Sequence, residues 1–391
     1  MSDAYLHGVR VIEASDGTRT IRTVATAVIG LVCTADDADA DIFPLNTPVL
    51  ITNPTAAMAN AGSTGTLKRA LNAIGSIVNT PTVIVRVADS EDSDTLTANI
   101  VGTVTEEGKY TGLKALTVAN SVVFVKPRLI AVPKFDNQAV ASEIGVIAKK
   151  LNGFGFISSN GATTKEQAVS YARNFASREL MMIFGDFLSF NADTAATEVD
   201  YATVRACAIQ AWIDKNIGWH KNVSNVEIAG VTGITHPLSF DIQDDSTDVN
   251  YLNSKNITVC LNNNGFKLWG SRTLSADTQF AFMQATRSAQ IIKDTLGEAF
   301  DWAIDKPLTP NLAKDMLEMI NSKFRFWKNL GYLVDGEAWL DVELNSKDQL
   351  KEGKFFIKYK YMWVPSLENL NMYQYIEDEY LVDFASKVAS A

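Results

Sequence analysis

The sequence predicts a multidomain protein of mixed α/β and α+β class with extended ends, and three observations carry this prediction. Short β-type runs dominate residues 21–112, strands and helices alternate over residues 113–262, and helical patterns dominate residues 263–370. The chain of 391 residues suits two or three domains at roughly 150 residues each. Its 47% hydrophobic and 20% charged residues are ordinary for a globular protein.

The first region is expected to form a small, mostly β domain at the surface. Residues 24–32, 48–51 and 82–87 are short runs of β-forming residues, and a helical patch over residues 66–77 interrupts them. Acidic loops that break the region are expected at residues 35–41 and 88–94.

The middle region alternates strand and helix patterns, which favours a layered α/β domain with a largely parallel sheet. Its expected strands are residues 128–132, 155–158, 180–184 and 257–261, and its expected helices are residues 137–151, 165–175 and 195–215.

The last region begins with helices and ends with a strand. An apolar stripe at helical spacing runs over residues 280–303. A second helix is expected to start at Thr309 and Pro310, which suit an N-cap and a first turn, and to end at Gly331. Residues 354–363 alternate lysine with aromatic residues and predict a long strand.

The two ends of the chain, residues 1–20 and 371–391, are expected to form arms. The strand pattern near the N-terminus has no neighbouring strand pattern with which to pair, and such terminal segments usually fray. Two explanations remain open from the residues alone. Either the ends fold back on their own domain as edge strands, or each copy donates them to the sheet of a neighbour.

The charge balance and the apolar runs exclude some functions. A net charge of −10 and a pI near 4.9 argue against broad nucleic-acid binding, which needs surplus lysine and arginine. The longest apolar runs are far shorter than the roughly 18 residues of a membrane span, so no direct membrane insertion is expected. Asp3, His7 and Arg10 stand where a secretory peptide needs an apolar core, which predicts synthesis and assembly in the cytoplasm.

No catalytic, cofactor-binding or metal-binding set emerges from the sequence. Asp37, Asp39 and Asp41 start like a calcium loop, but Ile42 and Pro48 occupy the positions that need glycine and glutamate. No nucleophile elbow, phosphate-binding loop or complete dinucleotide fingerprint occurs. The histidines, His7, His220 and His236, have no ligand-type partner at helical spacing, and the cysteines, Cys33, Cys207 and Cys260, are expected to be buried and reduced.

Two segments rich in glycine, asparagine and tryptophan, residues 218–234 and 264–274, suit tight turns and buried aromatic rings. Together with the Phe-Pro-Leu-Asn-Thr-Pro-Val run of residues 43–49 and the stretch over residues 365–370, they resemble contractile tail sheath proteins of temperate myophages and related injection particles. Ser271 stands where that family often has asparagine in its Trp-Gly-Asn-Arg-Thr motif.

The resemblance implies an outer β-rich domain, a central domain similar to the subtilisin-like α/β fold without its catalytic triad, and an inner C-terminal domain. It also implies a structural subunit, not an enzyme, without cofactors. Such subunits stack as six-fold rings around a tail tube and contract to drive the tube through a cell envelope. The implied partners are other copies, the tail tube protein, and the baseplate and tail terminator proteins, with assembly in the host cytoplasm into the virion tail. A headless bacteriocin or injection device, an α/β hydrolase and a monomeric binding module remain as alternatives.

The resemblance favours strand donation over arms that fold back. The residues implied in this exchange are Val9, Val11, Ile12, Phe355, Ile357, Tyr359, Tyr361, Asn371, Tyr373 and Tyr375. Charge motivates a further hypothesis, because basic residues cluster on or near the helix that starts at Thr309 while the chain as a whole is acidic. Lys314, Lys323, Arg325 and Lys328 either contact an acidic tube surface or form an ordinary solvated helix face.

Overall fold

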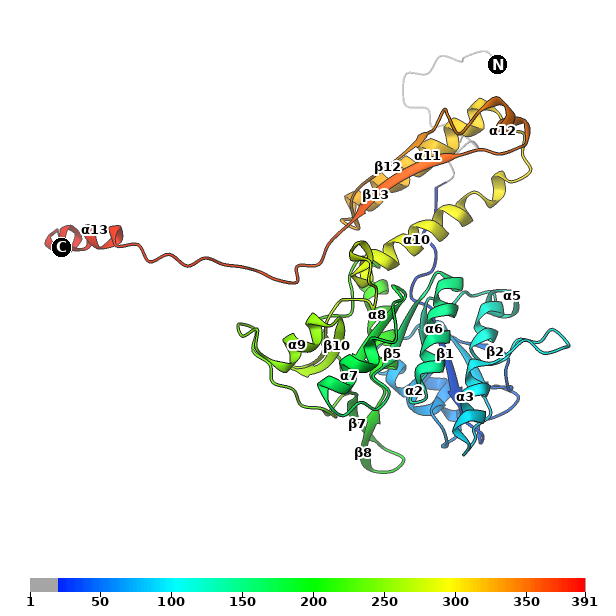
Figure 1. The fold of residues 1–391 in the computed structure, drawn as a ribbon, viewed down its shortest axis with the longest axis horizontal. Helices are drawn as coiled ribbons and strands as arrows, with labels where there is room; N and C mark the ends of the chain where they lie inside the picture. Colours follow the sequence, from blue (N-terminus) through cyan, green and yellow to red (C-terminus); the bar gives the residue numbers. More distant parts are fainter. Residues whose placement is uncertain (1–19, 391) are drawn as a thin grey trace, which may run out of the picture.

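The computed structural model describes residues 20–390, and its largest element is an eight-stranded sheet (Figure 1). The strands of this sheet are β1 (Ile29–Thr34), β2 (Pro48–Ile51), β3 (Thr82–Val87), β4 (Leu129–Ala131), β5 (Phe154–Ser158), β6 (Leu180–Phe184), β10 (Ile257–Asn262) and β11 (Phe266–Trp269). Their order is β11-β10-β6-β5-β4-β1-β3-β2. The six inner strands run parallel, and β2 and β11 close the two edges in antiparallel pairs.

Helices cover both faces of this sheet, as parallel strands require. In β1, Ile29 and Leu31 point into one core and Val32 into the other, following the two-residue period of a strand. The first core is covered by α2 (Leu67–Gly75) and α8 (Ala202–Asn216). The second is covered by α3 (Ser93–Val101), α4 (Gly112–Ala115), α6 (Gln138–Leu151), α7 (Lys165–Ala172) and α9 (Asp248–Ser254).

The structure corrects the expected β-rich domain over residues 21–112. Its strands β1, β2 and β3 stand in the same sheet as β4, β5 and β6, so they share both cores with the middle region. The reason is the parallel register of β1, which is paired with β3 on one side and with β4 on the other. The individual strands predicted at residues 48–51, 82–87 and 180–184 are confirmed.

The helix expected over residues 195–215 is wrong in its first part. Residues Ala196–Asp200 form β8, which pairs with β7 (Phe187–Asn191) and, through it, joins β9 (Gly233–Ile234) in a three-stranded antiparallel sheet. Cross-strand pairing therefore outweighs the helix preference of the alanines. The helix α8 begins only at Ala202. Asp200, the last residue of β8, forms an ion pair with Arg205 in the first turns of this helix.

The C-terminal part stands apart from the sheet as a smaller α+β unit (Figure 1). It combines α10 (Met283–Ala299), α11 (Pro310–Asn329), and an antiparallel hairpin of β12 (Leu333–Leu340) and β13 (Ile357–Trp363) joined through α12 (Lys347–Lys351). Phe324 and Trp327 of α11 lie in a third core with Ile292 of α10. The predicted helix start is confirmed, because the Thr309 side chain accepts a hydrogen bond from the first turn of α11.

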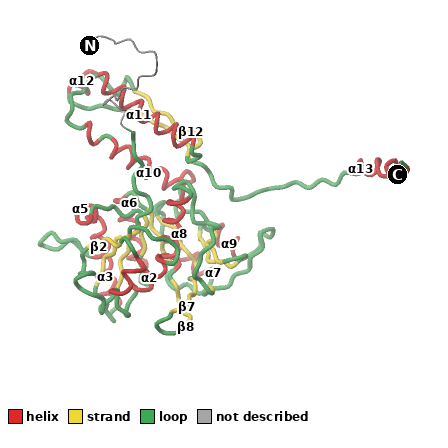
Figure 2. Tube along the Cα trace, turned by 180° about the vertical axis from the view of Figure 1, so that it is seen from behind, coloured by secondary structure: helices red, strands yellow, loops and turns green. Residues whose placement is uncertain are grey.

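Beyond the hairpin, the chain leaves the body as an extended tail that ends in α13 (Glu379–Ala389) (Figures 1 and 2). The helix lies within residues 371–391, for which the sequence predicts an arm and no helix. Of two further connecting helices, α1 (Pro54–Ala57) packs against α2, and α5 (Ala119–Val123) packs near the edge strand β2. Among residues 20–390, no helix is long and apolar enough to cross a membrane.

Candidate functional site

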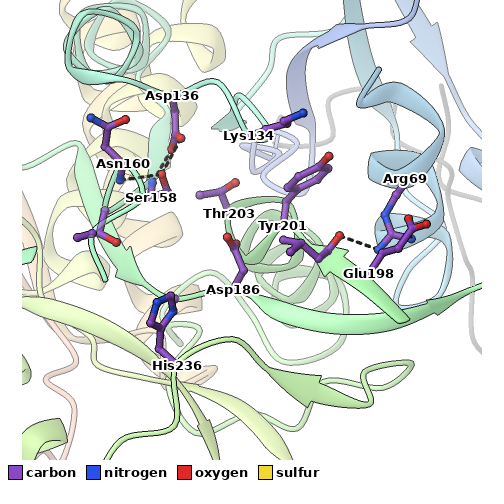
Figure 3. A pocket seen from close by; sticks show the side chains of 15 residues that line it. Arg69, Lys134, Asp136, Ser158, Asn160, Asp186, Glu198, Tyr201, Thr203 and His236 are labelled. Atoms are coloured by element: carbon purple, nitrogen blue, oxygen red, sulfur yellow. Dashed lines mark hydrogen bonds and ion pairs between the residues drawn. The ribbon is translucent and has the colours of Figure 1, made fainter. Parts of the chain in front are cut away.

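A polar pocket of about 460 Å³ opens where three inner strands of the sheet end (Figure 3). The segments that follow β4, β5 and β6 line it, at the edge where open α/β sheets usually bind ligands. Asp136 follows β4, Ser158 ends β5 and Asp186 follows β6. Thr203 of α8 and His236 also line the pocket, close to Asp186.

The side chains that line the pocket form most of their hydrogen bonds with neighbouring residues of the pocket lining. The Ser158 hydroxyl donates to the Asp136 carboxylate at 2.7 Å, and the Asp186 carboxylate accepts from the Ala202 N–H at 2.8 Å, at the start of α8. His236 Nδ1 lies 2.9 Å from the hydroxyl of Thr235. That hydroxyl also accepts from the backbone N–H of Asp186. These contacts hold loops in place, so a structural role accounts for each of them.

The acids of the pocket have perturbed proton affinities. Burial raises the pKa of Asp136, and burial raises the pKa of Asp186 to about 6. A shifted carboxyl in a cleft is a candidate for function, but buried structural groups shift in the same way. Within residues 20–390, no group of three or more histidine, cysteine or acidic side chains could hold a metal ion.

The three cysteines are free and buried, as expected. Burial raises the pKa of the Cys33 thiol to about 12 and also raises those of Cys207 and Cys260. A thiol that stays protonated is a poor nucleophile and a poor metal ligand. Their environment therefore matches that of small hydrophobic core residues.

The two glycine- and tryptophan-rich segments lie side by side. The Asn225 N–H donates to the Leu268 carbonyl at 2.9 Å, and the Gly270 N–H donates to the Ser224 hydroxyl at 3.1 Å. Gly270 has a φ of +136°, a conformation that favours glycine. The prediction of tight turns is thus confirmed.

Trp219, from the first of these segments, joins the body to the C-terminal unit. Its ring meets those of Trp327 and Tyr332 edge-on, with centroid distances of 5.7 and 5.5 Å. The predicted burial of this tryptophan is confirmed, because its side chain lies in the third core.

Buried polar contacts fix the same junction. Arg287 of α10 forms two hydrogen bonds with Asp214 of α8, and both side chains are almost fully buried. Asp294, further along α10, contacts Lys126, Arg128 and Asn152 of the body. The α/β body and the C-terminal unit are therefore held together by charge-assisted bonds that need a fixed geometry.

The predicted receiving strand is β13. Tyr359 packs towards Phe324 of α11, with ring centroids 5.9 Å apart, and Ile357 and Tyr361 pack against the third core. Phe355 lies half-buried just before the strand. In the described part of the chain β13 pairs only with β12, so the backbone groups along its other edge have no strand partner.

A groove of about 420 Å³ runs beside the second half of β13. Residues 359–363 form one wall, and Thr278, Gln279 and Phe280 form the other. An unpaired strand edge next to a groove is the arrangement that accepts an extended segment by strand addition.

The predicted donor residues of the C-terminal arm are fully displayed. Tyr373 and Tyr375 are 82% and 84% exposed, and Asn371 is also exposed. Their segment is extended and lies away from the body (Figure 1). The predicted donor residues of the N-terminal arm, Val9, Val11 and Ile12, lie outside the described residues.

The four basic residues predicted to contact a tube occupy different environments on α11. Lys323 is only 8% exposed, and its ammonium lies 5.0 Å from the centroid of the Trp327 ring. Arg325 pairs with Glu318, Lys328 pairs with Asp335 at 2.7 Å, and Lys314 is exposed. The structure therefore leaves Lys314, Arg325 and Lys328 at the surface and buries Lys323.

Family comparisons match nearly the whole chain. Residues 108–274 match the phage tail sheath protein central domain, residues 275–377 the phage tail sheath C-terminal domain, and residues 26–87 the domain III N-terminal region of tail sheath protein Gp18. The chain is 46% identical to the tail sheath protein of Escherichia phage P2, over all of both chains. It is 39% identical to the major tail sheath protein of Serratia phage KSP20, over 97% of each.

Solved structures show the same fold at low sequence identity. The contracted helical sheath of the anti-feeding prophage superposes with a TM-score of 0.70 and 16% identity, covering 96% of this chain and 100% of that chain. The contracted sheath complex of an extracellular contractile injection system, PVC, gives 0.70 and 14%, covering 97% and 100%.

Proposed function

This chain belongs to the phage tail sheath family, and from that premise we propose that its copies build a contractile sheath by exchanging terminal strands. The function of a tail sheath subunit follows from the family. The strand exchange is the proposed means by which copies hold together. It requires a donor segment without a partner and an acceptor edge without a partner in each copy.

The observation that carries this proposal is the pairing state of the C-terminal unit. Among residues 20–390 the sheet of β12 and β13 has two strands, and a sheet of two strands is marginally stable on its own. The same chain displays an extended tail whose aromatic side chains are exposed. Donor and acceptor thus occur in one molecule, and joining them between copies satisfies both.

The contraction mechanism we propose is mechanical. Rings of six copies stack around a tail tube in an extended, higher-energy state, and a baseplate signal lets them rotate into a shorter, wider helix. The tight junction of the body and the C-terminal unit, through Arg287 and Asp214, suits rotation of each copy as one piece. The strands remain paired, so motion passes from ring to ring. Extra burial of a few kcal/mol per copy, about 25 cal/mol per Å², supplies the drive without nucleotide.

The finer layout and the partners belong to the same proposal. We place the C-terminal unit on the inside, towards the tube, and the layered sheet, as a subtilisin-like domain without a triad, outside it. The expected domain limits at residues 262 and 370 stay predictions. Structures of the anti-feeding prophage baseplate also share this fold, with TM-scores of 0.67 and 0.72. Contacts with a baseplate, a tail terminator and a tube are accordingly proposed, with assembly in the host cytoplasm.

For the tube contact we propose the exposed basic residues of α11, namely Lys314, Arg325 and Lys328. Exposed ion pairs contribute little each, about 0.2–1 kcal/mol, so they release readily during contraction. Reversing Lys314 and Arg325 to glutamate should weaken binding to purified tubes while tubules without tube still form. Unchanged binding to the tube would remove this part of the proposal.

The main experiment deletes residues 371–391. We expect a folded monomer with an unchanged melting temperature, because this tail contributes no side chain to the described cores. We also expect no rings or tubules in negative-stain images, since the donated strand is gone. The control replaces Glu106 and Glu107, in an exposed turn of the body, with alanine and should polymerise normally. Tubules from the truncated protein would contradict strand exchange through this arm.

A further inference from the structure

The terminal helix α13 carries an apolar stripe that no described residue of its own copy covers. Leu381, Phe384 and Val388 are 68%, 68% and 61% exposed, and their spacing puts them on one helix face. The helix has 11 residues, a length at which isolated helices are marginal in water. Packing of this stripe against another surface is therefore what would stabilise the helix.

The tail keeps α13 away from the body of its own copy. The last described tail residues that bond to the body are Ser366, which accepts from Asn222 at 2.8 Å, and Glu368, which pairs with Arg272. From there the extended chain carries α13 far from both the sheet and the hairpin (Figures 1 and 2). The surface that covers the stripe consequently belongs to another molecule.

A matching apolar surface lies at the tip of the hairpin. It consists of the last residue of β12 and of residues in the connection to β13 that contains α12. All four side chains are exposed: Leu340, Val342, Leu344 and Leu350. Val342 is 79% exposed. We refer to these four residues as the tip patch. Stripe and tip patch are thus two uncovered apolar surfaces of the same chain.

Strand exchange brings these two surfaces together. The β13 strand has seven residues and spans about 23 Å, and residues 371–377 span the same length when extended. Antiparallel pairing, the more stable arrangement, would end the donated strand beside Ile357, where β13 begins. Ile357 lies at the tip end of the hairpin. The helix α13 starts only two residues later, at Glu379.

We propose that the arm of each copy ends in a helical anchor, in which the Leu381–Phe384–Val388 stripe packs on the tip patch of the neighbouring copy that receives its strand. The anchor rests on the proposed strand exchange and adds a second contact to it. Because the strand and the helix are linked, the helix binds at high effective concentration once the strand is in place. A linked apolar contact of this kind would resist slippage of the strand while the rings rotate.

A disulfide experiment tests the anchor. A Phe384→Cys protein and a Leu344→Cys protein are mixed in equal amounts, assembled and mildly oxidised. About half of the chains should form disulfide-linked dimers, because random co-assembly places each Phe384→Cys arm on a Leu344→Cys copy in about half of the contacts. The native cysteines are buried and do not interfere. The matched control pairs Ser386→Cys with Leu344→Cys; Ser386 lies on the opposite face of α13, so dimers should be rare.

The anchor and the strand exchange can fail separately. Backbone amide exchange along β13 is measured in the same tubules. If β13 becomes protected and the Phe384–Leu344 disulfide does not form, the anchor is overturned and strand exchange stands. If β13 stays unprotected in the tubules, the proposed exchange itself fails. As an independent readout, Phe384→Asp should raise the concentration needed for polymerisation roughly tenfold, and Ser386→Asp should leave it unchanged.

Discussion

The α/β body and the C-terminal tail place similar apolar residues in opposite environments. In the body, the strands of the large sheet are covered on both faces, and residues such as Phe154 and Leu31 have no exposed surface. In the tail, Tyr375 and Ile376 are 84% and 90% exposed. The hairpin is intermediate, because α11 covers one of its faces while its outer strand edges pair with no other strand in the described part of the chain.

This difference teaches where folding ends and assembly begins. A single copy can complete its body, so substitutions there should change the stability of the monomer. Within residues 20–390 the hairpin keeps an open edge and the tail stays exposed, so under the proposed strand exchange substitutions there should change polymerisation while the monomer remains unaffected. A residue of either region that behaves like the other region would break the comparison.

The largest effect is expected for Arg287→Ala, at the junction with the body. The substitution leaves the Asp214 carboxylate buried without its charged partner, and loss of such a partner costs about 3–5 kcal/mol. Urea unfolding of the monomer measures it. Arg325→Ala, which breaks an exposed pair with Glu318, is the matched control and should change the free energy of unfolding by less than about 0.5 kcal/mol. If both substitutions lower the free energy of unfolding equally, the junction does not belong to the part of the molecule that a single copy completes.

A smaller effect is expected for Gly270→Ala in the body. The φ of +136° strains any other residue, and a Cβ would lie 2.9 Å from Cα of Thr258 on β10. We expect a loss of about 2–3 kcal/mol in the free energy of unfolding. Gly297→Ala in α10, where a Cβ meets open space, should instead stabilise the monomer by about 0.5–1 kcal/mol. A tolerated Gly270→Ala would show that this turn is adaptable.

In the tail, Tyr373→Ser should leave monomer stability unchanged, because the tyrosine side chain is 82% exposed in a single copy. In the polymer it removes an aromatic side chain from the donated strand. We expect the concentration needed for tubule formation to rise roughly tenfold, equivalent to about 1.4 kcal/mol. Gln374→Ser, on the adjacent polar position, is the control. Sedimentation of tubules against concentration gives the measurement, and a fall in monomer melting temperature would break the comparison.

The success of sequence reasoning follows the same division. Strands such as β3 and β6 were predictable because burial on both faces produces continuous apolar runs. The common sheet of residues 29–87 and 129–269 was not, because parallel pairing between distant segments leaves no local signal. The pattern of residues 195–200 predicts helix, since Ala195 and Ala196 favour helix, and only pairing with β7 makes residues 196–200 the strand β8.

The residues of the candidate strand-exchange site were also only partly predictable from local sequence patterns. Tyr373 and Tyr375 are proposed as donor residues only through the family resemblance, because an exposed aromatic residue in an extended segment looks like any loop residue. The helix α13 has a readable stripe of Leu381, Phe384 and Val388, and reading residues 371–391 only as a strand-forming arm hid it. The burial of Lys323 could not be read from charge alone, because its alkyl chain and ammonium pack over aromatic rings.

The pocket in the body contains the buried Asp186 carboxylate, which forms no ion pair with a cation among residues 20–390. The pKa of Asp186 is about 6 in the folded protein and 3.8 ordinarily, with burial as the main cause. The folded state therefore holds the proton more tightly, and its stability falls as the pH rises from about 4 to 6. Asp186→Asn keeps an acceptor for the Ala202 N–H and removes the charge.

The asparagine variant should be more stable than the parent by about 1 kcal/mol at pH 7 and equally stable near pH 3.5. Urea unfolding at the two pH values measures this, with the exposed Asp39→Asn as control. A destabilised variant at pH 7 would mean that the Asp186 charge is matched by something within the fold. If monomer stability rises and polymerisation is unchanged, the pocket contributes to the folding of the body and does not contribute to the contacts between copies.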